Sequence, residues 1–390
     1  MGCNRKWFGR EWPCAVRCAA EIAKFAMVLA SGAAAPVGAV FAATIVIGQS
    51  APLTGGNADL GLDIRNGAAS YFKKVNDAGG INGNTIKLVT LDDKNETALS
   101  AANTKALIEQ HNAVALFGYA SSTLSIPAMP AVKDAKLPFF APFTGADAIR
   151  KQNDFVYTTR ATYADEIEKI IGFWGNLGSS RIAVLHYDDA VGKQNFETVS
   201  KSLAKFGKMP VSVSIKRNAD LTDAAVKEIV AADPQVIVAT TLYAPIAQMV
   251  RKLRASNHHY QVSSLSFAGA SQIAKALGEE ASGISVALTV PIPNQQQIPV
   301  VKECADAWAS AGLSGTMSVT ALEACISAKV LVEGIRKAGA TVNRESLHRA
   351  LSSLGRVDTG GYVIQFKPGF RHGGTFVDIA VIRRNGDLKG

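Results

Sequence analysis

A pair of serines, Ser121 and Ser122, stands between a β-rich run at Val114–Phe117 and a helix predicted at Thr123–Lys136. In an open parallel sheet, ligands bind beyond the carboxyl ends of the strands. Ser and Thr favour the start of a helix, where free N–H groups and the positive end of the helix dipole attract an anion such as a carboxylate. We expect these serines to contact a polar ligand group, and the alternative is that Ser122 or Thr123 only caps the helix.

Phe143, Thr144 and Gly145 follow the next β-rich run, Leu137–Ala141. Thr144 offers a hydroxyl, Gly145 lets the backbone approach a ligand closely, and Phe143 offers an apolar surface. We expect all three to lie in the same site as the serines. The alternative is an ordinary turn from a strand into a helix.

The second half of the chain offers fewer polar groups at its predicted strand ends. Tyr243 follows the run Gln235–Thr240, and its amphipathic ring suits the covering of an organic ligand or simple packing. Asp188 and Asp189 follow another run, but adjacent carboxylates more often cap the next helix or face solvent than bind a metal. We apply the same reasoning to Asp92-Asp93, and we expect no metal site.

The signatures of common enzymes are missing from the sequence. No Gly-x-Gly-x-x-Gly follows the first β-rich run, and there is no P-loop, no His-Glu-x-x-His and no Gly-x-Ser-x-Gly. The six histidines are scattered along the chain. We therefore expect no catalytic residues and no cofactor.

Two series of alternating β-rich runs and amphipathic stretches position these residues. Such alternation predicts parallel sheets covered by helices, so the fold class is α/β with two doubly wound lobes. Helices predicted at Pro299–Ala311, Ser318–Ala338 and Arg344–Leu354, followed by β-like runs, indicate that the chain returns to both lobes. The predicted boundaries are 43–160 plus 290–355 for the first lobe and 161–289 plus 356–390 for the second.

Residues 1–42 read as an export signal. Five basic residues lie among the first 24, and an Ala- and Gly-rich apolar stretch then leads to small residues at Ala42 and Ala43. This order is typical of a cleaved secretory signal, and the alternative is a membrane anchor. Export predicts a periplasmic protein without a ready supply of nucleotides, which disfavours a dehydrogenase.

The charge and the cysteine content of the chain are the next features. The formal net charge is +9 over 390 residues, and no basic run with interleaved aromatic residues points to nucleic acid. Beyond the leader, Cys304 and Cys325 are the two cysteines. A disulfide and two buried thiols both fit their positions.

Several segments resemble the leucine/isoleucine/valine-binding proteins of bacterial ABC transporters. They are Ile47–Gly55, Asn76–Gly83, Leu91–Asp93, Ala141–Ala146 and Arg160–Glu166. The resemblance implies the type I periplasmic binding protein fold, with two lobes joined by three hinge crossings that close around a ligand. It also implies an ABC permease and an ATPase as partners. In such a protein Ser121, Ser122 and Phe143–Gly145 hold the polar head of the ligand, and Tyr243 lies over it.

Two positions depart from the pattern of that family. Val191 stands where amino-acid-binding members usually carry an aromatic ring, and Ser266 stands near the place of their usual acidic residue. Because an unpaired buried ammonium is unfavourable, the hypothesis from sequence is a ligand other than a standard α-amino acid. A small carboxylate, an amide or an aromatic acid suits the remaining set.

The resulting prediction is a monomeric, non-enzymatic solute-binding protein of an ABC importer. A ligand-sensing receptor subunit of the same fold and a secreted α/β enzyme are the alternatives. A pocket that holds a base within reach of a nucleophile would favour the enzyme.

Overall fold

The computed structural model describes residues 43–55, 57–151 and 154–390. The described residues belong to one compact unit. The predicted export signal, 1–42, lies outside the described residues. None of the described helices has the length and apolar character needed to cross a membrane.

The first sheet is wholly parallel and contains five strands in the order β2-β1-β3-β4-β5. Its register places Ile47 of β1 opposite Leu88 of β2 and Ala115 of β3. The order reverses between β1 and β3, and this switch point is where doubly wound sheets open a crevice for ligands. The strands are β1 (Thr44–Ala51), β2 (Thr85–Asp92), β3 (Ala115–Phe117), β4 (Phe139–Phe140) and β5 (Val156–Tyr157).

Helices connect these strands, and their apolar faces explain where they pack. In α2 (Ala58–Asp77) the buried residues Ile64, Ala68, Tyr71, Phe72 and Val75 recur at helical spacing, as the sequence predicts. The other connections are α3 (Thr97–Glu109) and the short α6 (Asp147–Arg150).

The single helix predicted at Thr123–Lys136 is wrong in detail. The structure has α4 (Ser122–Ser125), the 3₁₀ turn η1 (Ile126–Ala128) and α5 (Met129–Asp134) in its place. Pro127 and Pro130 lack an N–H, so the α-helical hydrogen-bond ladder is interrupted there.

The second sheet has seven strands in the order β14-β13-β10-β9-β8-β6-β7. The five strands from β7 to β10 are parallel, and their order reverses between β6 and β8, which makes a second switch point. The strands are β6 (Ile182–Tyr187), β7 (Val211–Ile215), β8 (Val236–Thr240), β9 (Gln261–Ser264), β10 (Ser285–Leu288), β13 (Asp378–Ile382) and β14 (Leu388–Lys389). The helices are α7 (Tyr163–Asn176), α8 (Ala190–Ala204), α9 (Asp223–Ala232), α10 (Tyr243–Ala255) and α11 (Ala270–Leu277).

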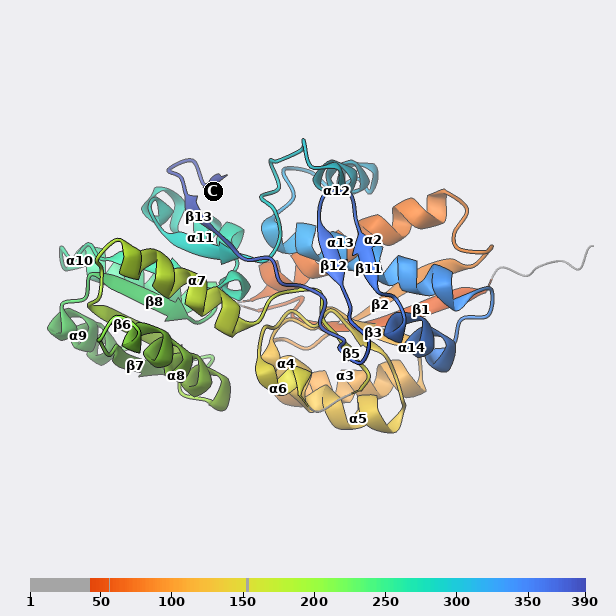
Figure 1. Ribbon diagram of the computed structural model, residues 1–390, viewed down its shortest axis with the longest axis horizontal. Helices are drawn as coiled ribbons and strands as arrows, with labels where there is room; N and C mark the ends of the chain where they lie inside the picture. The colour runs from red at the N-terminus through yellow and green to blue at the C-terminus, as the bar shows by residue number, and fades with distance from the viewer. Residues whose placement is uncertain (1–42, 56, 152–153) are drawn as a thin grey trace, which may run out of the picture. The chain divides into compact units, whose positions relative to one another are not determined.

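The C-terminal third of the chain packs helices and a separate hairpin against the first sheet and adds strands to the second (Figure 1). Helices α12 (Pro299–Ser310), α13 (Val319–Ala338) and α14 (Arg344–Ser352) share a hydrophobic cluster with β1, while β13 pairs antiparallel to β10. The hairpin β11 (Arg356–Asp358) and β12 (Val363–Gln365) also places Val357 and Ile364 in the cluster of β1. The lobe boundaries given above stay predictions.

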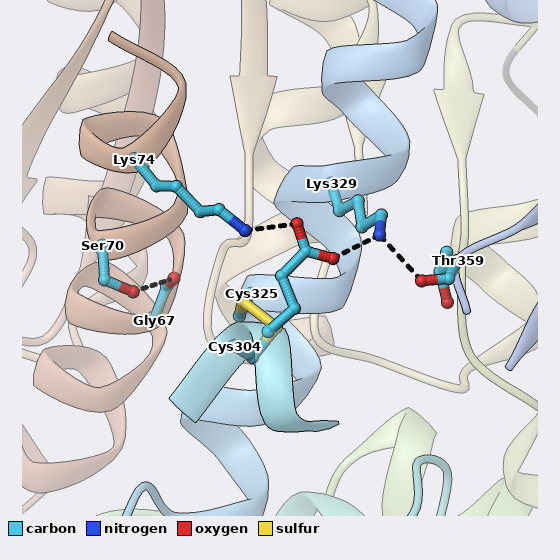
Figure 2. Close-up of a disulfide and its surroundings, with 8 residues drawn as sticks. Gly67, Ser70, Lys74, Cys304, Cys325, Lys329 and Thr359 are labelled. Atoms are coloured by element: carbon cyan, nitrogen blue, oxygen red, sulfur yellow. Dashed lines mark hydrogen bonds and ion pairs between the residues drawn. A yellow bond between two sulfur atoms is a disulfide. The ribbon is translucent and has the colours of Figure 1, made fainter. Parts of the chain in front are cut away.

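A disulfide joins Cys304 of α12 to Cys325 of α13, with their Cα atoms 6.0 Å apart (Figure 2). Beside it, Lys74 of α2 and Lys329 of α13 both bind the carboxylate of Glu303. Lys329 also donates a hydrogen bond of 2.8 Å to the carbonyl oxygen of Thr359. We call Lys74, Glu303 and Lys329 the brace cluster, because together they tie α2, α12 and α13 to one another.

Candidate binding site

The strand ends of both sheets meet at one small buried cavity. Its volume is about 10 Å³, which is about the space of one water molecule. Ser121 follows β3 and Leu242 follows β8, so each switch point contributes to the lining. The full lining is Leu60, Ala120, Ser121, Phe143, Arg160, Leu242, Ser266, Phe267, Thr320 and Glu323.

A larger hollow of about 450 Å³ also lies at strand ends of both sheets. Its lining includes Lys94–Glu96 after β2, Tyr187 at the end of β6 and Asn218–Asp220 after β7. The Asn95 side chain donates a hydrogen bond of 2.8 Å to Asn218 Oδ1. A hollow of about 660 Å³ beside Arg150 and Arg371 does not include any strand end of the switch points. Topology therefore favours the buried cavity over the hollow of about 660 Å³.

Ser121 has an unusual backbone, with φ at +140°. A non-glycine residue in this region is strained, and such residues cluster at ligand sites. The Ser121 hydroxyl accepts a hydrogen bond of 3.4 Å from the Leu124 N–H, so Ser121 caps the helix in place of Ser122 or Thr123, to which the sequence analysis gave this role. Ser121 also lines the cavity, and its contact with a ligand stays a prediction.

Ser122, Thr144 and Gly145 follow residues that line the cavity, namely Ser121 and Phe143. The hydroxyls of Ser122 and Thr144 are 2.6 Å apart, and Thr144 Oγ1 also accepts a hydrogen bond from the Ala146 N–H. A Cβ on Gly145 would come 2.5 Å from the backbone nitrogen of Tyr163, so glycine is needed here for packing. The structure therefore brings these three residues next to the cavity without placing them in its lining.

Arg160 lines the cavity with a charged side chain, and the sequence analysis did not predict it as a site residue. Its side chain is 2% exposed, and the guanidinium carbon lies 5.9 Å from the centre of the Phe143 ring. One nitrogen, Nη2, donates a hydrogen bond to Ser266 Oγ. The segment from β5 to α7 that carries Arg160 is one of the passages between the two sheets.

Two buried carboxylates flank this guanidinium. Glu166 Oε1 lies 3.8 Å from Nη2, and Glu323 Oε1 lies 3.4 Å from Nε. Glu166 is fully buried on α7, and Glu323 on α13 is 7% exposed. We call Arg160, Glu166 and Glu323 the site cluster.

The pKa shifts follow from this burial. Burial opposes the charge of Arg160, but the two carboxylates outweigh it and raise the pKa of the guanidinium. Burial raises the pKa of Glu166 and of Glu323, with Arg160 acting in the opposite direction. The charges of the site cluster are therefore stabilised mainly by their mutual attraction, because little solvent reaches them.

Acidic groups are present at Ser266, although the neighbouring sequence has none. The Ser266 N–H donates a 2.7 Å hydrogen bond to Glu166 Oε2, and its hydroxyl donates one of 2.9 Å to Oε1. The expectation of a site without a carboxylate at Ser266 is wrong, because α7 and α13 supply carboxylates from elsewhere in the chain. The argument against an α-amino acid ligand assumed that no carboxylate was available for its ammonium group, and it therefore no longer holds.

Tyr243 and Val191 are not among the residues that line the cavity. Tyr243 begins α10 and belongs to the core of the second sheet, with 9% of it exposed. Val191 lies in the first turn of α8, packed against a hydrophobic cluster. Leu242, the residue before Tyr243, reaches the cavity from this side.

The adjacent aspartates have structural partners. Asp189 caps α8 through the Gly192 N–H and pairs with Arg217 at 2.7 Å, while Asp188 pairs with Lys193. Burial raises the pKa of Asp93 to about 6, and Asp93 accepts a hydrogen bond from the Ser50 hydroxyl. No group of three or more His, Cys, Asp or Glu residues suited to a metal is present among residues 43–55, 57–151 and 154–390.

Arg160 and Glu323 are visible in the sequence only in hindsight. Arg160 lies in a segment that resembles the binding-protein family, and Glu323 is the single charge in the apolar run Val319–Ile326. A lone carboxylate in an apolar helix face requires a buried partner, so it was a usable signal.

Two doubly wound sheets that direct both switch points into one cavity are the architecture of a bilobed α/β binding protein. The model of the family "Periplasmic binding protein" matches residues 44–387, so the chain belongs to this family. The fold is accordingly the type I periplasmic binding protein fold.

Individual relatives agree with this assignment. A substrate-binding periplasmic protein from Ralstonia solanacearum is 33% identical, with 88% of this chain and 99% of that chain covered and a TM-score of 0.83. A possible leucine/isoleucine/valine-binding protein from Rhodopirellula baltica is 26% identical, with 89% and 96% covered and a TM-score of 0.85. An amino acid binding protein from Pseudomonas aeruginosa is 28% identical over 54% of this chain and 58% of its own length. The chain spans about half the length of the curated relatives it matches.

Proposed function

We propose that this protein is the periplasmic solute-binding component of an ABC importer of the branched-chain amino acid type. It closes two lobes around a small amino acid, amide or carboxylate and delivers this solute, as a monomer, to a permease driven by an ATPase. The observation that carries the proposal is the cavity of charged and hydroxyl groups at which the switch points of both sheets meet. The names of the relatives support the same role.

Residues from both sheets take part in the proposed binding. Ser121, Ser122, Thr144 and Gly145 hold the polar head of the solute, and Phe143 packs against it. Tyr243 and Val191 border the apolar part from the second sheet, and Ser266 lies between the solute and Glu166. Contacts between the two sides, such as the Gln272 side-chain amide to Asp63 at 2.7 Å and Lys275 to Asp59 at 2.9 Å, favour the closed arrangement.

A thermal-melting screen tests the proposal. Residues 43–390 are unfolded and refolded to remove carried solute, then melted with amino acids, amides, and aliphatic and aromatic carboxylates. A solute that binds only the folded form, at about 100 times its dissociation constant, adds about 2.7 kcal/mol of stability. A folded protein whose melting temperature none of these solutes raises would contradict the proposal.

A further inference from the structure

The wall of the cavity contains hydrogen-bond donors without acceptors. Arg160 is almost completely buried, and neither its Nε–H nor its Nη1–H groups have a hydrogen-bond partner. Nε lies 3.4 Å from Glu323 Oε1, close enough for an ion pair but without a hydrogen bond. A buried donor left without an acceptor is destabilising, so an acceptor on a bound solute would be favourable here.

The cavity also offers an acceptor without a matching donor. Both oxygens of Glu166 accept hydrogen bonds from Ser266, and Glu323 Oε2 accepts one of 3.2 Å from the Thr289 hydroxyl. Glu323 Oε1 accepts no hydrogen bond from the described residues, and Glu323 lines the cavity. A donor on the solute would therefore have a free oxygen to meet, next to the unpartnered Arg160 nitrogens.

The charge of the site cluster limits the charge of the solute. Two carboxylates face one guanidinium, so with both carboxyls ionised the cluster carries one excess negative charge. An anionic solute would add a second negative charge in a cavity where little water can screen it. A solute without net negative charge avoids this penalty.

We propose that Arg160 and Glu323 make the site selective for a solute without net negative charge whose head group has an acceptor beside a donor. A carboxamide and the zwitterion of an α-amino acid both fit this description, whereas a simple monocarboxylate does not. The inference rests on the proposed function and names the solute class for that same cavity. Under this proposal Glu323 determines specificity, although it belongs to helix α13 and does not follow a strand.

Matched probes with an aliphatic or an aromatic side chain test the selectivity. Refolded 43–390 is titrated calorimetrically at pH 7 with leucine, 4-methylpentanamide, 4-methylpentanoate and 3-methylbutylamine, and with benzamide against benzoate. We expect leucine or an amide to bind more than about tenfold tighter than the matching carboxylate, because like charges are costly to juxtapose. The comparison of leucine with 4-methylpentanamide then separates the amino acid from the amide.

The variant Glu323→Gln removes the excess negative charge while keeping the shape of the side chain. We expect it to reduce the preference for amide over carboxylate by about tenfold, whereas Glu303→Gln, in the brace cluster away from the cavity, should leave that preference unchanged. Should Glu323→Gln not fold, the order of the probes in the wild-type protein still decides the question.

The two proposals fail in different ways. Carboxylates that bind as tightly as their amides, or an unchanged preference in a folded Glu323→Gln variant, would overturn the selectivity and leave the solute-binding function in place. A folded protein that binds none of the six probes would overturn both.

Discussion

Two groups of three charges each include a residue of helix α13, and they differ in burial and in the hydrogen bonds that they leave unmade. The brace cluster places one carboxylate, Glu303, between two lysines, and both of its oxygens are bound. The site cluster places one guanidinium, Arg160, between two carboxylates and leaves donors on Arg160 without partners. Complete pairing is typical of a structural contact, whereas incomplete pairing beside a cavity is typical of a binding site.

The largest expected effect comes from breaking the site cluster. Arg160→Ala leaves two buried carboxylates without a counter-charge, and we expect the free energy of unfolding to fall by about 3–5 kcal/mol. Lys329→Ala is the matched change in the brace cluster, where Glu303 keeps Lys74, and should cost only about 1 kcal/mol. Urea unfolding at pH 7 measures both, and equal losses would remove the distinction between the clusters.

The disulfide beside the brace cluster should matter for stability and not for selectivity. Changing Cys304 and Cys325 together to Ala opens a crosslink between positions 21 residues apart, and we expect a loss of roughly 3 kcal/mol. Because neither cysteine lines the cavity, the ratio of amide to carboxylate affinity should not change. A variant with wild-type stability, or with an altered ratio, would count against this separation.

The packing of α2 on α13 supports both clusters, and one glycine permits it. A Cβ on Gly67 would come 2.1 Å from the carbonyl oxygen of Ala321, so Gly67→Ala should destabilise by about 1–3 kcal/mol. Gly172→Ala is the control, because nothing lies near a Cβ there and alanine favours a helix by about 1 kcal/mol. Thermal unfolding should therefore move in opposite directions for the two variants, and a shift in the same direction would refute the packing argument.

The smallest effect is a difference in pH dependence. Burial acts to raise the pKa of Glu303, but hydrogen bonds from Lys329 and Lys74 hold it below its ordinary value of 4.5. Its contribution is thus present above pH 4.5 and lost as the pH falls through the folded-state pKa. For Glu323 the pKa is raised, so stability is greatest below the ordinary value and is lost as the pH rises through the folded-state pKa.

The two glutamine variants make this contrast measurable. Between pH 4 and pH 8, Glu303→Gln should become less stable relative to the wild-type protein as the pH rises, by about 1 kcal/mol. Glu323→Gln should become relatively more stable over the same range. Urea unfolding across this pH range gives both trends, and parallel trends would contradict the assigned pKa directions.

The sequence predicts the helices, strands and strand-end residues that a local pattern of residue types specifies. The period of the apolar residues predicts β7 with its exact bounds and also predicts α2, but it starts that helix at Leu62 and not at Ala58. The residues that follow predicted strands include Ser121, Phe143 and Ser266 of the cavity lining. Strands of two residues, such as β4 and β5, are too short to show a period, and β5 was not predicted.

Features that depend on contacts between residues far apart in the chain could not be predicted from the sequence. Arg160, Glu166 and Glu323 meet only because β5, α7 and α13 converge, so their pairing has no signature in any single segment. The disulfide likewise depends on α12 packing beside α13, and the spacing of the two cysteines along the chain left pairing and free thiols equally open.

The most direct test of the account is a crystal structure of refolded 43–390 with whichever of the six probes binds most tightly. We expect the acceptor of the head group about 3 Å from Arg160 Nη1 or Nε, and its donor at the same distance from Glu323 Oε1. A probe seated elsewhere, such as in the hollow lined by Asn95 and Asn218, with these Arg160 nitrogens still unpartnered, would contradict it.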